Sequence, residues 1–176
     1  MSIVVDVGAY TGAETFKFLL DSEAKVFAFE PEAQQFRELL QKASEFPRLT
    51  VLPFAVDIGD NQEPLFHKSD GQSTLDPPMF GTAVPKFTMA WTIRLDTFMY
   101  LYSIFDIDYL HVDAPFREEM ILESLGNRVD QVKGGRIRRY GQRSVVPAWL
   151  LDHGFNIAVD STTGHFTEPD IRFFRT

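Results

Sequence analysis

The first 56 residues alternate between two hydrophobic periods. Three short runs are rich in valine, isoleucine and phenylalanine, and the stretches between them repeat apolar side chains at the spacing of one helix face. Short connections between such segments are typical of a β-α-β-α-β unit with parallel strands and right-handed crossovers. We expect strands at residues 3–7, 25–29 and 49–56, and helices at residues 13–20 and 31–44.

The rest of the chain is less regular but continues to alternate strands with helices. Residues 69–87 are rich in glycine and proline, which indicates a long loop. Beyond it, Asp96 is expected to cap a short helix. We expect strands at residues 63–68, 88–95, 107–112 and 129–132, helices at residues 97–103, 115–125 and 142–153, and a closing pair of strands at residues 155–160 and 170–174.

These elements predict a Rossmann-like α/β fold, which is a doubly wound, mostly parallel sheet with an antiparallel C-terminal strand. No internal repeat and no change of composition divides the chain, so residues 1–176 are expected to form a single domain. The chain begins at its first strand, and we expect no helix before that strand.

Composition narrows the cellular setting. The chain is 44% hydrophobic and 24% charged, which is typical of a soluble globular protein. It has neither a leader pattern nor an apolar run of about 20 residues, so we expect a cytoplasmic protein without a membrane span. Cysteine is absent, which excludes disulfides and thiolate metal sites, and the histidine and carboxylate spacing predicts no metal ion.

The net charge bears on the partners of the protein. The chain carries a formal charge of −8 at neutral pH. Nucleic acids and anionic lipids attract positively charged surfaces. The charge therefore predicts a small-molecule partner, with no nucleic acid and no membrane surface among the partners.

Glycines mark a candidate cofactor loop after the first expected strand. Gly8 follows the strand and Gly12 opens the helix, a turn that admits a ligand close to the backbone and can direct N–H groups at an anion. Glu30 lies eighteen residues after Gly12, at the end of the second strand, where a carboxylate can accept hydrogen bonds from two ribose hydroxyls. The two glycines alone fit tight packing equally well, but the set in this order favours a nucleoside-containing ligand.

The details of this loop favour S-adenosylmethionine over a dinucleotide. The spacing is Gly-x-x-x-Gly, without the third glycine of the pyrophosphate-binding turn. Asp6 stands beside the loop, where a carboxylate suits the ammonium of an amino-acid moiety and repels phosphate. A nicotinamide-dependent oxidoreductase is the weaker alternative.

With these motifs the chain resembles the FkbM-type family of class I S-adenosylmethionine-dependent methyltransferases. The resemblance runs in order along nearly the whole chain. Its first two motifs are shared by many methyltransferases, whereas the Arg-Leu-Asp and C-terminal segments are more particular. It is carried by residues 5–12, 27–31, 52–57, 71–75, 92–96, 106–113 and 170–173.

The resemblance implies methylation of a hydroxyl group on a sugar or natural product. It also implies that Gly8, Gly12 and Glu30 contact the cofactor and that Asp57 lies near the adenine. Other residues of the same motifs complete the expected cofactor site: Asp6, Ala9, Tyr10 and Pro31.

The acceptor side departs from the family pattern. Where the family commonly has Lys-x-Asp-x-Glu-Gly, this chain has His111-Val112-Asp113-Ala114-Pro115. Asp113, at a strand's carboxyl end, is the first candidate for the base that removes a hydroxyl proton, and His111 is the second. As alternatives, Asp113 caps the following helix, and His111 is a core histidine that lies one pleat deeper on the same strand face.

One segment of this acidic chain, residues 133–143, is basic. It contains Arg136, Arg138 and Arg139, which are expected to follow the fifth strand at the sheet rim that holds the cofactor. Arginine binds carboxylates and phosphates in a bidentate manner, so these residues are candidates for binding an anionic acceptor, either phosphorylated or uronic acid-bearing. A solvated basic loop is the alternative.

Two functions follow from these observations. The first is an S-adenosylmethionine-dependent O-methyltransferase that acts on a small hydroxylated acceptor. The second is a methyltransferase-like domain that binds the cofactor or a partner without turnover, as the replacement by Ala114 and Pro115 suggests. The cofactor site is expected to be open, or closed by the loop at residues 69–87 or by the second subunit of a homodimer.

Overall fold

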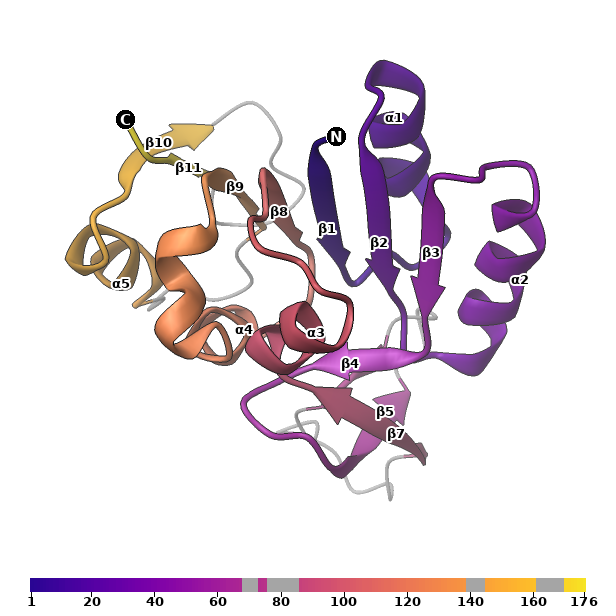
Figure 1. The fold of residues 1–176 in the computed structure, drawn as a ribbon. Coiled ribbons are helices and arrows are strands. Elements are labelled where there is room, and N and C mark those ends of the chain that lie inside the picture. Colours follow the sequence, from indigo (N-terminus) through magenta and orange to yellow (C-terminus); the bar gives the residue numbers. More distant parts are fainter. Residues whose placement is uncertain (68–72, 76–85, 139–144, 161–169) are drawn as a thin grey trace.

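The computed structural model describes residues 1–67, 73–75, 86–138, 145–160 and 170–176 (Figure 1). Its strands are β1 (Ile3–Val7), β2 (Lys25–Phe29), β3 (Leu49–Leu52), β4 (Phe54–Val56), β5 (Gln62–His67), β6 (Ser73–Thr74), β7 (Phe87–Ile93), β8 (Tyr109–Val112), β9 (Gly134–Ile137), β10 (Asn156–Asp160) and β11 (Asp170–Phe174). Its helices are α1 (Ala13–Asp21), α2 (Ala33–Ala43), α3 (Leu95–Leu101), α4 (Glu118–Glu123), the 3-10 helix η1 (Gly126–Gln131) and α5 (Val146–Asp152).

A seven-stranded sheet forms the centre of the fold, in the order β10-β11-β9-β8-β1-β2-β3. The five strands from β9 to β3 are parallel, and β11 is antiparallel to both β9 and β10. This arrangement confirms the Rossmann-like α/β fold with an antiparallel C-terminal strand. It also puts the carboxyl ends of β1, β2 and β8 on one rim, where ligands bind in open α/β sheets.

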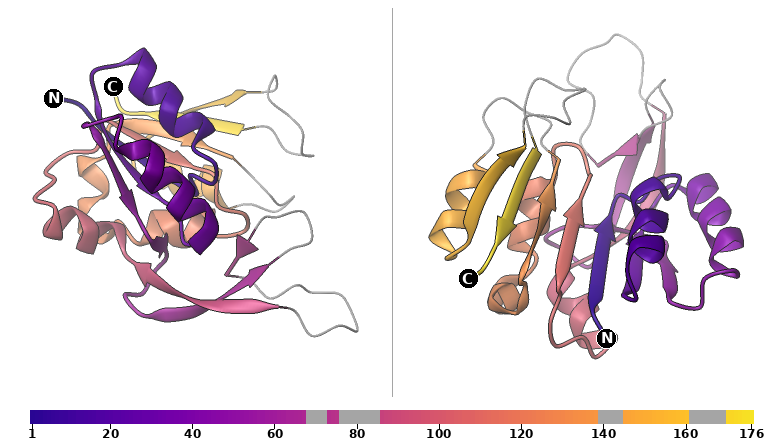
Figure 2. Two further views of the ribbon diagram at one scale, coloured as in Figure 1. Left: turned by 90° about the vertical axis from the view of Figure 1, so that its right-hand side faces the viewer. Right: turned by 90° about the horizontal axis from the view of Figure 1, so that it is seen from above.

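Helices cover the central sheet on two sides (Figure 2). On one face, α1 and α2 pack over β1–β3 through a cluster that includes Leu19 and Leu39. On the other face, α3, α4 and α5 contribute Phe98, Ile121 and Leu150 to the larger core. Because both faces of the inner strands are buried, these strands are almost continuously apolar instead of alternating with polar residues.

Pro53 divides the single strand expected at residues 49–56 into two. Proline has no N–H for a strand ladder, so the chain leaves the central sheet after Leu52. The next strand, β4, pairs with β7 in a second sheet of order β4-β7-β5-β6. The antiparallel strand expected at residues 63–68 is confirmed as β5. The small sheet extends to the carboxyl rim of the central one (Figure 1).

The prediction of a strand at residues 129–132 is wrong, because η1 runs through Gln131 and Val132 forms only an isolated bridge with Ile107. The fifth parallel strand is β9, inside the basic segment. Its two glycines allow close strand pairing, since a Cβ on Gly135 would lie only 1.9 Å from the carbonyl oxygen of Leu110 on β8. The start of the basic segment is therefore a strand and not the solvated loop of the alternative interpretation.

Three other expectations needed correction at helix ends and faces. Arg94, not Asp96, occupies the N-cap position of α3, and the Asp96 carboxylate forms an ion pair with Arg94 at 2.7 Å. Helix α4 begins at Glu118, three residues later than expected, because Phe116 has a left-handed backbone with φ 65°. Leu40 of α2, whose spacing along the helix predicts that it is buried together with Phe36, Leu39 and Ala43, is 51% exposed.

No helix in the described part of the chain is long and apolar enough to cross a membrane.

Core packing gives the first testable prediction. Phe98 on α3 is fully buried, and its ring centroid lies 5.1 Å from that of Phe27 and 4.9 Å from that of Phe29. Phe98→Ala is expected to lower the free energy of unfolding by about 3–5 kcal/mol, because it removes the ring and leaves a cavity. Urea denaturation measures the loss. Phe105→Ala is the matched control, since Phe105 is 78% exposed, and equal losses in both variants would contradict this description of the core.

Candidate functional site

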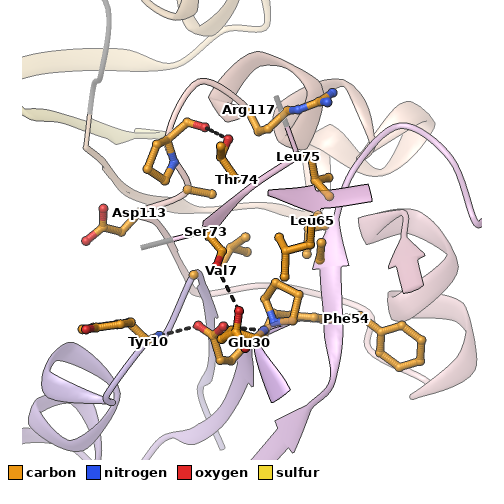
Figure 3. A pocket seen from close by; sticks show the side chains of 18 of the residues that line it. Val7, Tyr10, Glu30, Phe54, Leu65, Ser73, Thr74, Leu75, Asp113 and Arg117 are labelled. Carbon is orange, nitrogen blue, oxygen red and sulfur yellow. Dashed lines mark hydrogen bonds between the residues drawn. The ribbon is translucent and has the colours of Figure 1, made fainter. Parts of the chain in front are cut away.

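A pocket lies at the carboxyl rim of the central sheet, bounded by the ends of β1, β2 and β8 and by the small sheet (Figure 3). It contains about 920 Å³ of space, including the part open to solvent. The polar groups that line it come from Tyr10, Glu30, Glu32, Ser73, Thr74, Asp113, Arg117 and Arg138, and its walls are otherwise mostly apolar.

The loop after β1 requires both of its glycines. Gly8 and Gly12 have φ values of 83° and 88°, which L side chains rarely adopt. A Cβ on Gly8 would lie 2.3 Å from the carbonyl oxygen of Asp113, and one on Gly12 would lie 2.5 Å from the Leu39 side chain. Gly8 therefore lets the loops after β1 and β8 touch, and Gly12 lets α2 pack against the start of α1.

Four N–H groups of this loop are used within the protein. The N–H groups of Gly8 and Ala9 both donate to the carbonyl oxygen of Phe29, and the N–H of Gly12 donates to Ala9. The N–H of Tyr10 donates to the Glu30 carboxylate at 2.7 Å. These four donors are therefore not directed at an anion, and the expectation that the loop binds one stays a prediction.

Glu30 is a buried carboxyl group at the end of β2 that lines the pocket. Its Oε2 accepts the N–H of Tyr10 and its Oε1 accepts the N–H of Glu32, each at 2.7 Å (Figure 3). Burial raises the pKa of Glu30 to about 7 even though these two hydrogen bonds favour the carboxylate. Each carboxylate oxygen retains a second acceptor site. Glu30 can therefore accept hydrogen bonds from ligand hydroxyls while it holds the N–H groups of Tyr10 and Glu32. Pro31, the next residue, also lines the pocket.

Asp6 does not lie among the residues that line the pocket. Its carboxylate is buried behind the loop, where it accepts a hydrogen bond from the Thr15 hydroxyl and contacts His111 Nδ1 at 2.8 Å. Burial alone would lower the pKa of His111, but the hydrogen bond and the charge of Asp6 outweigh burial and raise it. Asp6 and His111 thus tie β1, β8 and α1 together beneath the cofactor loop.

Asp113 and Arg138 meet in the pocket as an ion pair, with 2.6 Å between Oδ2 and Nη1. Asp113 is not the cap of α4, whose N-cap position is Arg117. Of the two expected bases, Asp113 reaches the pocket, whereas His111 lies a pleat deeper and is only 2% exposed. The structure therefore brings Gly8, Tyr10, Glu30, Pro31, Asp113 and Arg138 together around one space.

One of the three expected acceptor arginines, Arg136, does not line the pocket. Arg136 points to the α1 side of the sheet and forms an ion pair with Asp170 on β11. Arg139 lies outside the described residues. Asp57, expected near the adenine, is buried next to the pocket: its Oδ1 accepts the N–H of Ile58, and its Oδ2 lies 3.2 Å from Arg117 Nη1. Arg117 itself lines the pocket.

The small sheet contributes side chains that sequence reasoning did not single out. Leu65 lies on the confirmed strand β5, and Ser73, Thr74 and Leu75 lie within the long loop expected at residues 69–87; all four line the pocket. The Ser73 hydroxyl donates to Glu32 at 3.0 Å, and the Thr74 hydroxyl donates to the carbonyl of Pro115 at 3.4 Å. The sequence signals were the family motif at residues 71–75 and the expectation that the loop could close the cofactor site, and neither assigned a role to these side chains.

Two aromatic residues beside the pocket have unusual backbone conformations. Tyr10 has φ 49° and Phe116 has φ 65°. A left-handed conformation costs about 1–2 kcal/mol for a residue other than glycine. Such strain concentrates at functional sites, and nothing in the residue types at these positions predicted it.

Known proteins resemble this chain in structure rather than in sequence. No protein-family model matches the sequence, and no curated protein matches it. TrmK of M. capricolum, solved with the cofactor product S-adenosylhomocysteine, aligns with 99% of this chain at 12% identity and a TM-score of 0.61. An rRNA methylase from Streptococcus thermophilus aligns with 99% at 15% identity and a TM-score of 0.57.

A third neighbour, Sp1610 of Streptococcus pneumoniae, is provisionally described as a tRNA (m1A22) methyltransferase. It aligns with 99% of this chain at 11% identity and a TM-score of 0.55. This chain spans 62% of TrmK, 86% of the rRNA methylase and 64% of Sp1610. At such identities the similarity shows the fold alone, which is the Rossmann-like α/β fold that these methyltransferases share. The narrower FkbM-type resemblance stays a prediction.

These neighbours overturn one expectation. The acidic composition predicted that nucleic acid is not a partner, but proteins with this fold are described as rRNA and tRNA methyltransferases. The exclusion was wrong because the net charge sums the charges of the whole chain, whereas nucleic acid binds to one local part of the surface. The charge of that part can differ from the net charge.

Glu30 gives a prediction about pH and stability. Its pKa is 4.5 in an ordinary environment and about 7 in the fold, so the folded protein holds this proton more tightly than the unfolded chain. The resulting stabilisation is fully present below pH 4.5, is lost as the pH rises through 7, and amounts to about 3 kcal/mol. Glu30→Gln cannot titrate, so wild type should lose about this much relative to the variant between pH 4.5 and 8.

Urea denaturation of wild type and Glu30→Gln across this pH range measures the difference. Glu23→Gln is the matched control, because the Glu23 side chain is 96% exposed. A wild-type-minus-variant difference that does not change with pH would show that Glu30 titrates normally.

Proposed function

We propose that this protein is an S-adenosylmethionine-dependent methyltransferase. The observation that carries the proposal is the pocket itself, in which Glu30 stands beside a loop that already uses the N–H groups of Gly8, Ala9, Tyr10 and Gly12. This arrangement suits a nucleoside that carries no phosphate. It disfavours a nicotinamide dinucleotide, whose pyrophosphate needs N–H donors from the same loop. Neighbours of the same fold solved with S-adenosylhomocysteine or S-adenosylmethionine support the choice of cofactor.

The residues of the pocket fit such a cofactor in three parts. Glu30 can accept the ribose hydroxyls, and Pro31 and Val56 provide apolar surface for the adenine. Gly8, at the end of β1, lines the pocket where the amino-acid moiety can lie close to the backbone. When bound, the cofactor supplies an electrophilic methyl group on a sulfonium. Positioning of the acceptor then accounts for most of the catalysis that the protein must provide.

Asp113 is the proposed acceptor-side carboxylate. It lies in the pocket, whereas His111 is buried beneath the sheet rim and is better suited to holding Asp6. A small hydroxylated acceptor would need a base for its proton, and Asp113 is the carboxylate beside the cofactor loop. Arg138 supports an acceptor that carries a phosphate or carboxylate, provided that the acceptor displaces Asp113 from it.

RNA is the second candidate acceptor, and two structural neighbours described as RNA methyltransferases motivate it. A domain that binds the cofactor without turnover is the other candidate, motivated by Ala114 and Pro115 at the end of β8. Release of labelled methyl groups onto hydroxylated glycosides or onto total RNA separates the two acceptor classes. Cofactor binding without transfer to either would favour the non-catalytic domain.

Titration calorimetry tests the cofactor directly. We expect S-adenosylmethionine and S-adenosylhomocysteine to bind and NAD not to bind. Glu30→Ala should weaken both by about 10- to 100-fold, because it removes a buried acceptor of hydroxyl hydrogen bonds. Glu23→Ala, at an exposed acidic position, should leave both affinities unchanged. Binding of NAD alone, or equal binding to wild type and Glu30→Ala, would refute the proposal.

A further inference from the structure

The outer face of the small sheet carries large apolar side chains in a line. Along β7, Phe87, Met89 and Trp91 lie on one face of the strand, because successive side chains point to opposite faces. They are 52%, 54% and 57% exposed. Ala90, between the last two, points to the other face and is only 6% exposed. The strand therefore presents its large side chains to solvent and a small one to the interior.

The neighbouring strand β5 extends this apolar face. Antiparallel pairing places Phe66 directly opposite Phe87, and Pro64 directly opposite Met89. Residues that are directly opposite in this way share a face of the sheet. The rings of Phe66 and Phe87 lie side by side, with 5.8 Å between their centroids. We call Pro64, Phe66, Phe87, Met89 and Trp91 together the apolar stripe.

The opposite face of the same sheet is packed against the body of the protein. Ala55, Leu65, Leu75 and Ala90 form a buried cluster there. Leu65 and Leu75 also line the pocket. In the left view of Figure 2, β7 runs along the lower margin of the molecule, with the central sheet above it. The apolar stripe thus faces away from the core of its own chain.

The size of the apolar stripe is that of an interaction surface. Monomeric proteins rarely expose contiguous apolar patches larger than a few hundred Å². Large side chains such as phenylalanine and tryptophan bury about 150–250 Å² each, so covering the exposed halves of three of them removes on the order of 300 Å² from water. A standard interface buries about 800 Å² on each partner. The apolar stripe is therefore large enough to form the apolar centre of such an interface.

Charge decides between the possible partners. The apolar stripe contains no charged residue, whereas the whole chain carries a formal charge of −8. Nucleic acids and anionic lipid surfaces need cationic side chains at the contact, and the stripe offers none. Two copies of an acidic protein repel one another over most of their surface, so they can approach best through an uncharged face. A second copy of this chain therefore fits the apolar stripe.

The order of the side chains along β7 suits a two-fold axis. In a two-fold dimer both copies use the same patch, which must be complementary to itself. An axis at Met89, perpendicular to β7 and between the two sheets, reverses the direction of the strand. Phe87 of one copy then meets Trp91 of the other, and the two Met89 side chains meet at the centre. Contacts between aromatic rings, and between methionine sulfur and aromatic rings, are favourable.

We propose that this protein forms a two-fold symmetric homodimer in which the apolar stripes of two copies pack face to face, with the axis at Met89. Two sheets that pack in this way lie about 10 Å apart and interdigitate their side chains. Because Leu65 and Leu75 on the inner face line the pocket, the interface supports one pocket wall from behind. The surface lies outside the methyl-transfer site, so the dimer does not depend on the identity of the cofactor.

Sedimentation velocity over a range of protein concentrations tests the dimer. Wild type is expected to be dimeric at micromolar concentration. Met89→Lys and Met89→Asp each bring like charges together at the axis, so either variant alone should raise the dimer dissociation constant by about 100-fold or more. Met89→Leu keeps an apolar side chain and should stay dimeric. Since Met89 is 54% exposed, all three variants should keep the circular dichroism spectrum of wild type.

A mixture of the two charged variants makes the test specific to this axis. Equal amounts of Met89→Lys and Met89→Asp should recover the dimer, because opposite charges then meet across the axis. Mixing would not repair a folding defect in either variant. Leu101→Lys is the matched control at an apolar position on α3 that is 62% exposed, and it should stay dimeric.

A wild type that remains monomeric up to its solubility limit would overturn the proposal. A dimer that both Met89→Lys and Trp91→Lys leave intact would also overturn it, because the contact would then lie elsewhere. Loss of the dimer in the charged variants without recovery in the mixture would contradict the axis at Met89. A monomeric wild type that binds phosphatidylcholine vesicles or single-stranded RNA, and loses this binding in Trp91→Lys, would assign the apolar stripe to another partner.

Discussion

Between the ends of β1 and β8 there is no room for a side chain, since an added Cβ on Gly8 would lie 2.3 Å from the carbonyl oxygen of Asp113. This contact sets the distance between the cofactor loop and the expected acceptor loop. One pleat below it, Asp6 on β1 contacts His111 on β8 at 2.8 Å. The two strands are thus joined at the rim, by the contact of Gly8 with Asp113, and one pleat below it, by the contact of Asp6 with His111. The side chains that they carry into the pocket therefore have fixed positions relative to one another.

The charges near this junction are used in pairs. Asp6 is shared by Thr15 and His111, Asp113 pairs with Arg138, and Arg136 pairs with Asp170. A buried charge without a partner is costly, so each pair restricts which groups can act on a ligand. Asp6 is committed to the scaffold, whereas Asp113 and Arg138 are committed to each other within the pocket. A ligand that binds at Asp113 must therefore compete with or join an existing ion pair, which favours ligands that present both donors and acceptors.

Much of the scaffold could be predicted from the sequence because it depends on local patterns. The strand–loop–helix order around Gly8 and Gly12, and the place of Glu30 at the next strand end, follow from periodicity and turn residues. Features set by contacts between distant segments could not be predicted. The glycines of β9 serve close pairing with β8 and β11, Pro53 transfers the chain to another sheet, and Asp6 faces His111, which is 105 residues away. The pocket wall at Ser73–Thr74 is equally a product of tertiary packing.

The error about nucleic acid has the same origin. A formal charge of −8 describes the whole chain, but recognition of a base depends on a few side chains at one rim. Stacking on an aromatic ring requires no net positive charge, because the attraction arises from contact between two flat apolar faces. An acidic domain can therefore bind a single nucleotide through rings and paired polar groups while its overall charge repels a long phosphate backbone. The pocket contains the ring of Tyr10 and the paired charges of Asp113 and Arg138, so the composition of the chain does not by itself exclude a base-bearing ligand.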